Sequence, residues 1–220
     1  MHTHTALARP AALVALFAFA LAASAADSRE SRAVGEFTEV GVAAPIDVHV
    51  SLGDQHSLTL EGDPEVLARI ETAVENGRLR IRTKPGQHYA WNARRKTTAR
   101  VVARRIEGLS IAGSGDITAP AITGGALKVS IAGSGDIRVG GRVEGLTASI
   151  AGSGDIRASD LEAEKVKVTI AGSGDATVRA RQALSVNVSG SGDVRYHGDP
   201  AVEQKIMGSG SVRRAGGSTS

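Results

Sequence analysis

Apolar and polar residues alternate along the second half of the chain, and the alternation returns every 18 to 20 residues. In one copy Leu127, Val129 and Ile131 are apolar, whereas Lys128 and Ser130 between them are polar. A period of two is typical of β-strands with one buried and one solvated face. Because similar strands recur at a nearly fixed spacing, the sequence predicts a stack of coils rather than a closed globule.

A four-residue motif, Gly-Ser-Gly-Asp, follows the apolar positions of each copy. Both glycines have the parity of the apolar residues, so we expect them to face inward, where the missing Cβ permits a corner or a close backbone approach. The aspartates have the polar parity and are predicted to form an outward ladder, with one carboxylate per coil at intervals of about 4.8 Å. The copies begin at Gly113, Gly133, Gly152, Gly172, Gly190 and Gly208. The ladder consists of Asp116, Asp136, Asp155, Asp175 and Asp193, and Ser211 takes the aspartate's place in the sixth copy.

These features predict an all-β fold, with a parallel β-helix or β-solenoid in the C-terminal half and the repeats at residues 107–212. Carboxylates stacked at the coil spacing repel one another unless hydroxyls, backbone amides, cations or water screen them. We therefore expect a structural ladder in which Asp and Ser satisfy the amides of the turns. Calcium binding is the alternative, although one carboxylate per coil supplies few of the about six to eight oxygens that calcium takes.

Short strands and turns alternate in the N-terminal half, over residues 37–82. Asp63 before Pro64 has the pattern of a helix N-cap followed by proline at the first helical position, which predicts a short helical turn at residues 64–69. The apolar runs on either side of Asn76-Gly77 predict a β-hairpin. A parallel coil with a tight corner at that dipeptide has the same pattern, and this alternative stays open.

The two ends of the chain differ from the rest. Residues 1–25 predict a signal peptide, because an apolar run over residues 11–22 is too short to span a bilayer and precedes the A-x-A cleavage site Ala23-Ser24-Ala25. We expect an exported chain, periplasmic, outer-membrane-associated or extracellular, without a transmembrane segment after cleavage. Residues 26–35 are polar and are expected to form a flexible leader, and residues 213–220 a flexible tail.

The composition favours stacked aliphatic layers over an aromatic-centred core. Aromatic residues make up 3% of the chain, glycines number 27, and cysteine is absent, which excludes disulfide bonds. Arg9 lies in the predicted signal peptide, so 25 of the 26 basic side chains remain beside 23 acidic ones. The net charge of the mature chain is therefore small, and its distribution matters more than its sum.

Residues 84–97 lack the alternation and are predicted to be a basic and aromatic loop inserted between coils. From Arg78 to Arg105 ten residues are Lys or Arg and none is Asp or Glu. Such a patch suits an acidic glycan or an anionic lipid surface. Nucleic acid is not expected as a partner, because the chain is predicted to be exported. The alternative is an ordinary exposed loop beside strands whose arginines form the solvated face. The predicted partner-binding residues are Tyr89, Trp91, Arg94, Arg95 and Lys96.

The sequence offers little support for catalysis. It has no cysteine nucleophile, no Gly-x-Ser-x-Gly turn and no His-Glu-x-x-His pair. After residue 25 the histidines are His49, His56, His88 and His197, which lack metal-ligand spacing. No catalytic residue, cofactor or metal is therefore predicted.

The order of these features resembles the putative auto-transporter adhesin, head GIN domain family. The resemblance rests on residues 37–82, on the repeated Gly-Ser-Gly-Asp coils and on the closing Gly-Ser-Gly-Ser-Val, and it covers nearly the whole chain after residue 25. It implies a right-handed parallel β-helix, here a single domain over residues 36–212, that acts as a non-enzymatic, adhesin-like binding module for an extended partner. Two alternatives stay open, a carbohydrate-active enzyme of the parallel β-helix type and a purely structural envelope protein.

Overall fold

The computed structural model describes residues 28–86 and 97–216. Over these ranges the chain forms fifteen β-strands and one short helix, α1 (Pro64–Leu67). The strands are β1 (Ser28–Arg32), β2 (Glu39–Ala43), β3 (Asp47–Leu52), β4 (Ser57–Gly62), β5 (Ile70–Glu75), β6 (Arg78–Thr83), β7 (Thr98–Ala103), β8 (Gly108–Gly113), β9 (Asp116–Gly133), β10 (Ile137–Gly152), β11 (Ile156–Gly172), β12 (Ala176–Gly190), β13 (Val194–His197), β14 (Ala201–Gly208) and β15 (Val212–Arg214).

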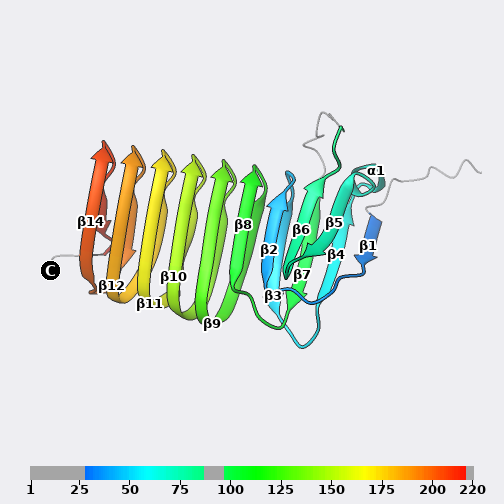
Figure 1. The fold of residues 1–220 in the computed structure, drawn as a ribbon, viewed down its shortest axis with the longest axis horizontal. Coiled ribbons are helices and arrows are strands. Elements are labelled where there is room, and N and C mark those ends of the chain that lie inside the picture. Colours follow the sequence, from blue (N-terminus) through cyan, green and yellow to red (C-terminus); the bar gives the residue numbers. More distant parts are fainter. Residues whose placement is uncertain (1–27, 87–96, 217–220) are drawn as a thin grey trace, which may run out of the picture.

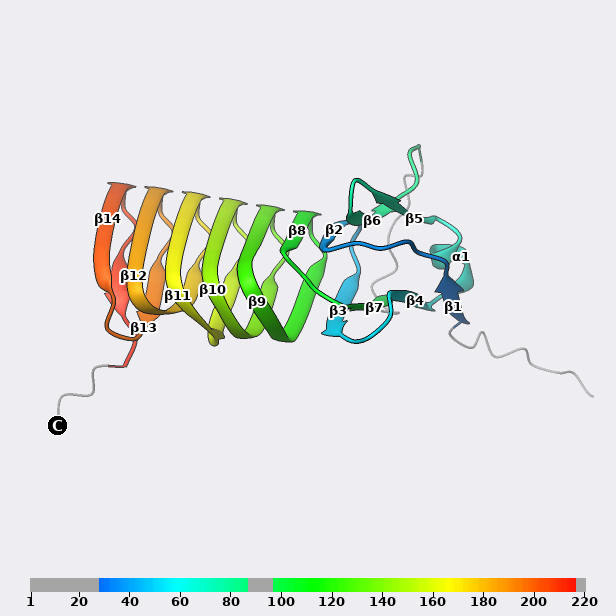
Figure 2. The same cartoon turned by 60° about the horizontal axis from the view of Figure 1, so that its bottom comes forward.

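The strands build two facing walls joined by corners (Figures 1 and 2). Wall A, as we name it, follows β1-β4-β7-β3, the first halves of β9 to β12, and then β13 and β15. Wall B follows β5-β6-β2-β8, the second halves of β9 to β12, and then β14. Each long strand belongs to both walls, since residues 116–118 of β9 pair with β3 and residues 128–133 pair with β8. The predicted all-β solenoid is confirmed, with about five turns in the C-terminal half.

The parallel register aligns equivalent residues of successive coils into columns. In wall B, Ile131, Ile150, Ile170 and Val188 are consecutive partners, and each is at most 2% exposed. Burying an aliphatic side chain of this size contributes roughly 2 kcal/mol. The interior is therefore a set of aliphatic layers, one per coil, which suits a chain with few aromatic residues.

The Gly-Ser-Gly-Asp motif forms the corner that leads from wall B to wall A. At its second glycine, a Cβ on Gly154 would lie 2.1 Å from the carbonyl oxygen of Gly135 in the preceding coil. At its first glycine, Gly152 has a φ of 135°, which side chains disfavour, and its Cβ would lie 2.3 Å from the carbonyl oxygen of Gly133. The same oxygen accepts a hydrogen bond from the N–H of Ser153 at 2.9 Å. Glycine is therefore required at both positions for the coils to approach this closely.

The opposite corner absorbs the differences in coil length. The register between neighbouring coils is irregular between Arg138 and Gly140 in one pair and between Ala158 and Glu162 in the next. The columns of wall B and the motif corner stay in register through these changes. The spacing can therefore vary from 18 to 20 residues without disturbing the motif.

The N-terminal elements follow their sequence signals. Asp63 caps α1, because its Oδ1 accepts a hydrogen bond from the N–H of Glu65 at 2.9 Å. Strands β5 and β6 pair antiparallel across Asn76-Gly77. The hairpin interpretation is thus confirmed, and the alternative of a parallel coil at that dipeptide is wrong.

The flexible leader predicted at residues 26–35 is wrong over Ser28–Arg32, which form β1 and pair antiparallel with β4. The segment is polar, so its strand has no apolar signature in the sequence. Side-chain contacts hold it in place, because Arg29 forms an ion pair with Glu61 on β4 and Arg32 Nη2 donates a hydrogen bond to the backbone carbonyl of Leu67 at 3.2 Å. Arg213 and Arg214 of the predicted tail likewise belong to β15. The predicted signal peptide and residues 217–220 lie outside the described residues. Within the described residues, no helix is long and apolar enough to cross a membrane.

Candidate functional site

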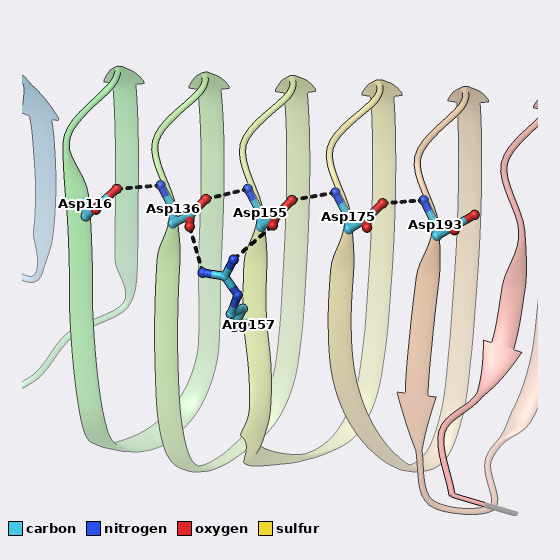
Figure 3. A network of polar contacts seen from close by, with 6 residues as sticks. All are labelled: Asp116, Asp136, Asp155, Arg157, Asp175 and Asp193. Atoms are coloured by element: carbon cyan, nitrogen blue, oxygen red, sulfur yellow. Dashed lines mark hydrogen bonds and ion pairs between the residues drawn. The ribbon is translucent and has the colours of Figure 1, made fainter.

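The ladder aspartates link each coil to the next (Figure 3). One carboxylate oxygen of each aspartate accepts a hydrogen bond from the backbone N–H at the same position of the following coil. The four bonds between aspartates are Asp136 N–H to Asp116 Oδ1 at 2.9 Å, Asp155 N–H to Asp136 at 3.0 Å, Asp175 N–H to Asp155 at 3.0 Å and Asp193 N–H to Asp175 at 2.8 Å. The carboxylates thus act as acceptors for corner amides, and charge-assisted bonds of this kind are stronger than neutral ones.

A cation reduces the repulsion in the middle of the ladder. Arg157, two residues beyond Asp155 in wall A, donates through Nη1 to Asp136 at 2.6 Å and through Nη2 to Asp155 at 3.0 Å. The bond to Asp136 raises the pKa of Arg157 above its ordinary value. Among the described residues, no three His, Cys, Asp or Glu side chains form a group that could hold a metal ion.

The ladder ends on a hydroxyl. In the sixth copy both the backbone N–H and the Oγ of Ser211 donate to Asp193 Oδ1, at 2.9 and 2.8 Å. These bonds, the hydroxyl bond first, lower the pKa of Asp193 below its ordinary value. An aspartate at position 211 would instead place a further carboxylate beside Asp193, whereas the serine hydroxyl donates a second hydrogen bond to it.

In the basic stretch from Arg78 to Arg105, most of the described positive charges lie beside negative ones. Its arginines contact acids that lie outside the stretch in sequence, on neighbouring strands or loops. The pairs are Arg78 with Glu39, Arg80 with Glu75, Arg82 with Glu71, Arg100 with Glu61, Arg104 with Glu36 and Arg105 with Glu107. Lys84 donates to the carbonyl of Ala68 at 2.7 Å. The described part of the stretch is therefore not a free cationic patch.

The predicted partner-binding residues Tyr89, Trp91, Arg94, Arg95 and Lys96 lie outside the described residues. Gly86 and Thr97 are the described residues that flank this segment in the sequence.

Wall B carries a groove that was not predicted from the sequence. Its volume is about 540 Å³, and it crosses β9 to β12 and β14 on the outer surface. Small residues in register leave the space, because Ala126, Gly145, Ala183 and Ala201 stand at the same outward position where β11 has Lys165. The remaining residues that line it are Leu146, Thr147, Val166, Lys167, Leu184, Ser185, Val202 and Glu203. A column of small side chains at one strand position is the signal by which the sequence could have located it.

The lysines of this surface have no acidic partner in the described part of the chain. Lys165 and Lys167 project from β11 in the middle of the groove, and both are exposed. Lys128 lies in the same column as Lys167 two coils away, at about 10 Å. Glu203 lies at the β14 end. The groove therefore combines an apolar floor with unpaired positive charge at its centre.

Comparison with protein families assigns the chain to a family. Residues 36–200 match the family described as putative auto-transporter adhesin, head GIN domain. The chain belongs to this family. A comparison with curated proteins found no match.

Three solved structures resemble the head GIN domain described here. A putative adhesin from Bacteroides fragilis has a TM-score of 0.70 at 19% identity, covering 86% of this chain and 97% of its own. A putative lipid binding protein from Parabacteroides distasonis has a TM-score of 0.56 at 22% identity, covering 88% and 98%. A putative adhesin from Parabacteroides merdae has a TM-score of 0.51 at 17% identity, covering 88% and 98%. At these identities the likeness shows a common fold.

Proposed function

We propose that the chain is an exported, non-enzymatic, adhesin-like binding module that holds an extended anionic partner across the coils of wall B. The groove with unpaired Lys165 and Lys167 at its centre is the observation that carries this proposal. Membership of an adhesin family supports a surface-binding role. Cleavage after Ala25 would release the chain to the periplasm, the outer membrane or the cell exterior.

The shape of the groove favours a long partner. Each coil advances the groove by about 4.8 Å, so the five strands it crosses span roughly 20 Å. A repeated surface suits a partner that is itself extended, whereas a compact substrate calls for an enclosed pocket. The apolar floor suits an acyl chain or the apolar face of a sugar, and the lysines suit a phosphate or carboxylate.

We propose that the groove binds its partner and does not catalyse a reaction on it. In the groove Glu203 is the sole acid among the described lining residues. The ladder carboxylates each accept a corner amide, and Asp136 and Asp155 also bind Arg157. A glycosidase of the common type needs two carboxyl groups that flank the scissile bond. An acidic glycan or an anionic lipid is therefore a ligand in this proposal, and not a substrate.

A charge-removal experiment tests the groove. We expect Lys165→Ser with Lys167→Ser to weaken binding to anionic vesicles about 30-fold, since each lysine near an anionic surface contributes about 1 kcal/mol. Arg138→Ser with Arg195→Ser is the matched control, because it removes the same charge from exposed positions of wall A. Zwitterionic vesicles test whether the lipid charge is needed, and comparing anionic vesicles with a heparin-like resin separates lipid from glycan binding. Equal losses in the two double variants would contradict a site in the groove.

A steric variant tests the groove without changing charge. A Cβ at Gly145 meets only the carbonyl oxygen of Lys165 at 4.0 Å, so a larger side chain fits there and fills the groove. We expect Gly145→Leu to fold normally by circular dichroism and to lose most vesicle or resin binding. Full retention would show that the partner binds elsewhere.

The inserted loop is a second proposed contact. We propose that Tyr89 and Trp91 stack on a sugar or insert at a lipid interface while Arg94, Arg95 and Lys96 attract the anion. The triple variant of the three cations to Ser should reduce retention on envelopes or on a heparin-like resin, and Trp91 fluorescence should shift when an acidic glycan or anionic vesicle is added. Unchanged retention with an intact fold would leave the insert as an ordinary loop.

A further inference from the structure

Strand β14 leaves the C-terminal end of wall B open. It pairs with β12 on one side, and no described strand pairs with its other edge. Two residues of β14, Val202 at 40% and Met207 at 57%, are the exposed large hydrophobic side chains of the described chain. At the other end of the solenoid, Leu67 on α1 and Ile70 are buried and close the core. Within the described residues, the exposed large hydrophobic side chains therefore lie on an edge strand at the C-terminal end of the solenoid.

The free edge of β14 offers regular hydrogen-bonding groups. In a parallel ladder, alternate residues direct their N–H and C=O to opposite neighbours. The N–H of Ser209, just beyond β14, donates to the carbonyl of Gly190 in the preceding coil. Glu203 and Lys205 lie an even number of residues before Ser209, so they also direct their backbone groups to β12. Val202, Gln204 and Ile206 direct theirs to the open edge, and such an edge is a template for a further strand.

We propose that β14 pairs antiparallel with β14 of a second copy of this chain, about a two-fold axis through Gln204. In this register Gln204 faces Gln204 of the second copy, and Val202 faces its Ile206. Both are pairs of residues whose backbone groups point to the open edge, as hydrogen-bonded antiparallel pairs require. The two glutamine amides can bond each other, because each carries a donor and an acceptor.

The charges of β14 select this register. Glu203 lies opposite Lys205 of the second copy, and Lys205 lies opposite its Glu203. These are non-hydrogen-bonded pairs, in which the side chains approach most closely. Moving the axis to residue 203 would place two glutamates opposite each other, and moving it to residue 205 would place two lysines there. The edge is thus complementary to itself about Gln204, as a two-fold interface requires.

The surface suits a weak, reversible dimer. Eight residues of β14 extend roughly 26 Å, and two walls about 10 Å apart give an end surface on the order of 300 Å² per copy. A total of about 600 Å² lies below the range of stable specific interfaces, so we expect the dimer to form at high protein concentration. The two copies of wall B would then form one continuous sheet with two grooves.

Sedimentation velocity over a concentration series tests the proposal. Wild type should show a concentration-dependent dimer. Glu203→Lys alone and Lys205→Glu alone should each raise the dimer dissociation constant about tenfold or more, because like charges then stand opposite each other. The double variant Glu203→Lys with Lys205→Glu should restore the wild-type constant. A monomer at every concentration up to about 1 mM, or single variants that dimerise like wild type, would overturn the proposal.

A cross-linking experiment gives an independent readout. The chain has no cysteine, so Gln204→Cys introduces a single thiol on the proposed axis. Directly opposed residues lie about 5.5 Å apart between Cα atoms, which a disulfide spans. Under mild oxidation this variant should form a covalent dimer, whereas the control Ser189→Cys, on the neighbouring β12, should stay monomeric. Equal cross-linking of the two variants would contradict the two-fold register.

Discussion

At each corner the second glycine of the motif sets the distance between neighbouring coils. A Cβ on Gly154 would overlap the carbonyl oxygen of Gly135, which is backbone and cannot move away without displacing its own coil. The inward parity and the close approach of these glycines follow from the alternation in the sequence. The carbonyl contact itself does not, because it depends on the stacking of two coils 19 residues apart.

We expect Gly154→Ala to cost about 3 kcal/mol or more of unfolding free energy, because the backbone clash must be relieved by separating the coils. Gly125→Ala is the matched control, since a Cβ at Gly125 meets no atom within 4 Å. Chemical denaturation measures both changes. Similar stabilities for the two variants would show that the coils do not meet at this glycine.

Asp193 shows how the ladder responds to pH. Its pKa is lowered in the folded chain, chiefly by the hydroxyl of Ser211. A carboxyl group with a depressed folded pKa contributes stability above its ordinary pKa of about 3.9, and this contribution is lost as the pH falls through the folded value.

Ser211→Ala should therefore raise the pKa of Asp193 toward its ordinary value, while the backbone bond from residue 211 remains. The variant should be less stable than wild type near neutral pH, and the difference should vanish in acid once Asp193 is protonated in both proteins. NMR titration of the Asp193 carboxyl group measures the pKa. An unchanged pKa would mean that the hydroxyl does not bond the carboxylate.

The alternation of apolar and polar residues predicts a strand well where one face of that strand is buried. Wall B follows the predicted parity, with Val129, Ala148, Val168 and Val186 buried in register. β1 escaped prediction because Ser28–Arg32 bury no apolar side chain and bond β4 through backbone and charged groups. Periodicity therefore identifies strands through burial, and a polar strand at the end of a sheet gives no such signal.

Ile150→Asp should lower the unfolding free energy by several kcal/mol, because it places an unpaired carboxylate in the middle of an aliphatic column. Ala151→Asp is the control on the next, outward residue of β10, and should change stability by about 0.5 kcal/mol or less. Thermal melts of the two variants provide the comparison. Equal destabilisation would mean that the parity of the strand is reversed.

Over the whole molecule, the distribution of charge depends on the fold more than on the sequence. The stretch from Arg78 to Arg105 contains no acid, yet its described arginines meet glutamates from other segments. Lys165 and Lys167 lie near Glu162 and Glu164 in sequence but remain unpaired, since both glutamates contact Arg181 instead. Which cations are free for a partner could therefore not be read from charge runs. The groove has a signal in the sequence, the small residues at equivalent positions of the repeats, but this signal becomes visible only once the coils are aligned in register.

The outer surface of wall B is proposed to bind an extended anionic partner. An array of acidic and neutral glycans and of anionic and zwitterionic lipids, probed with the mature chain, tests this binding without prior choice of a ligand. We expect signals on anionic members only, which weaken as salt shortens the Debye length from about 8 Å to about 3 Å. Equal signals on neutral members, or anionic signals that salt does not weaken, would contradict it.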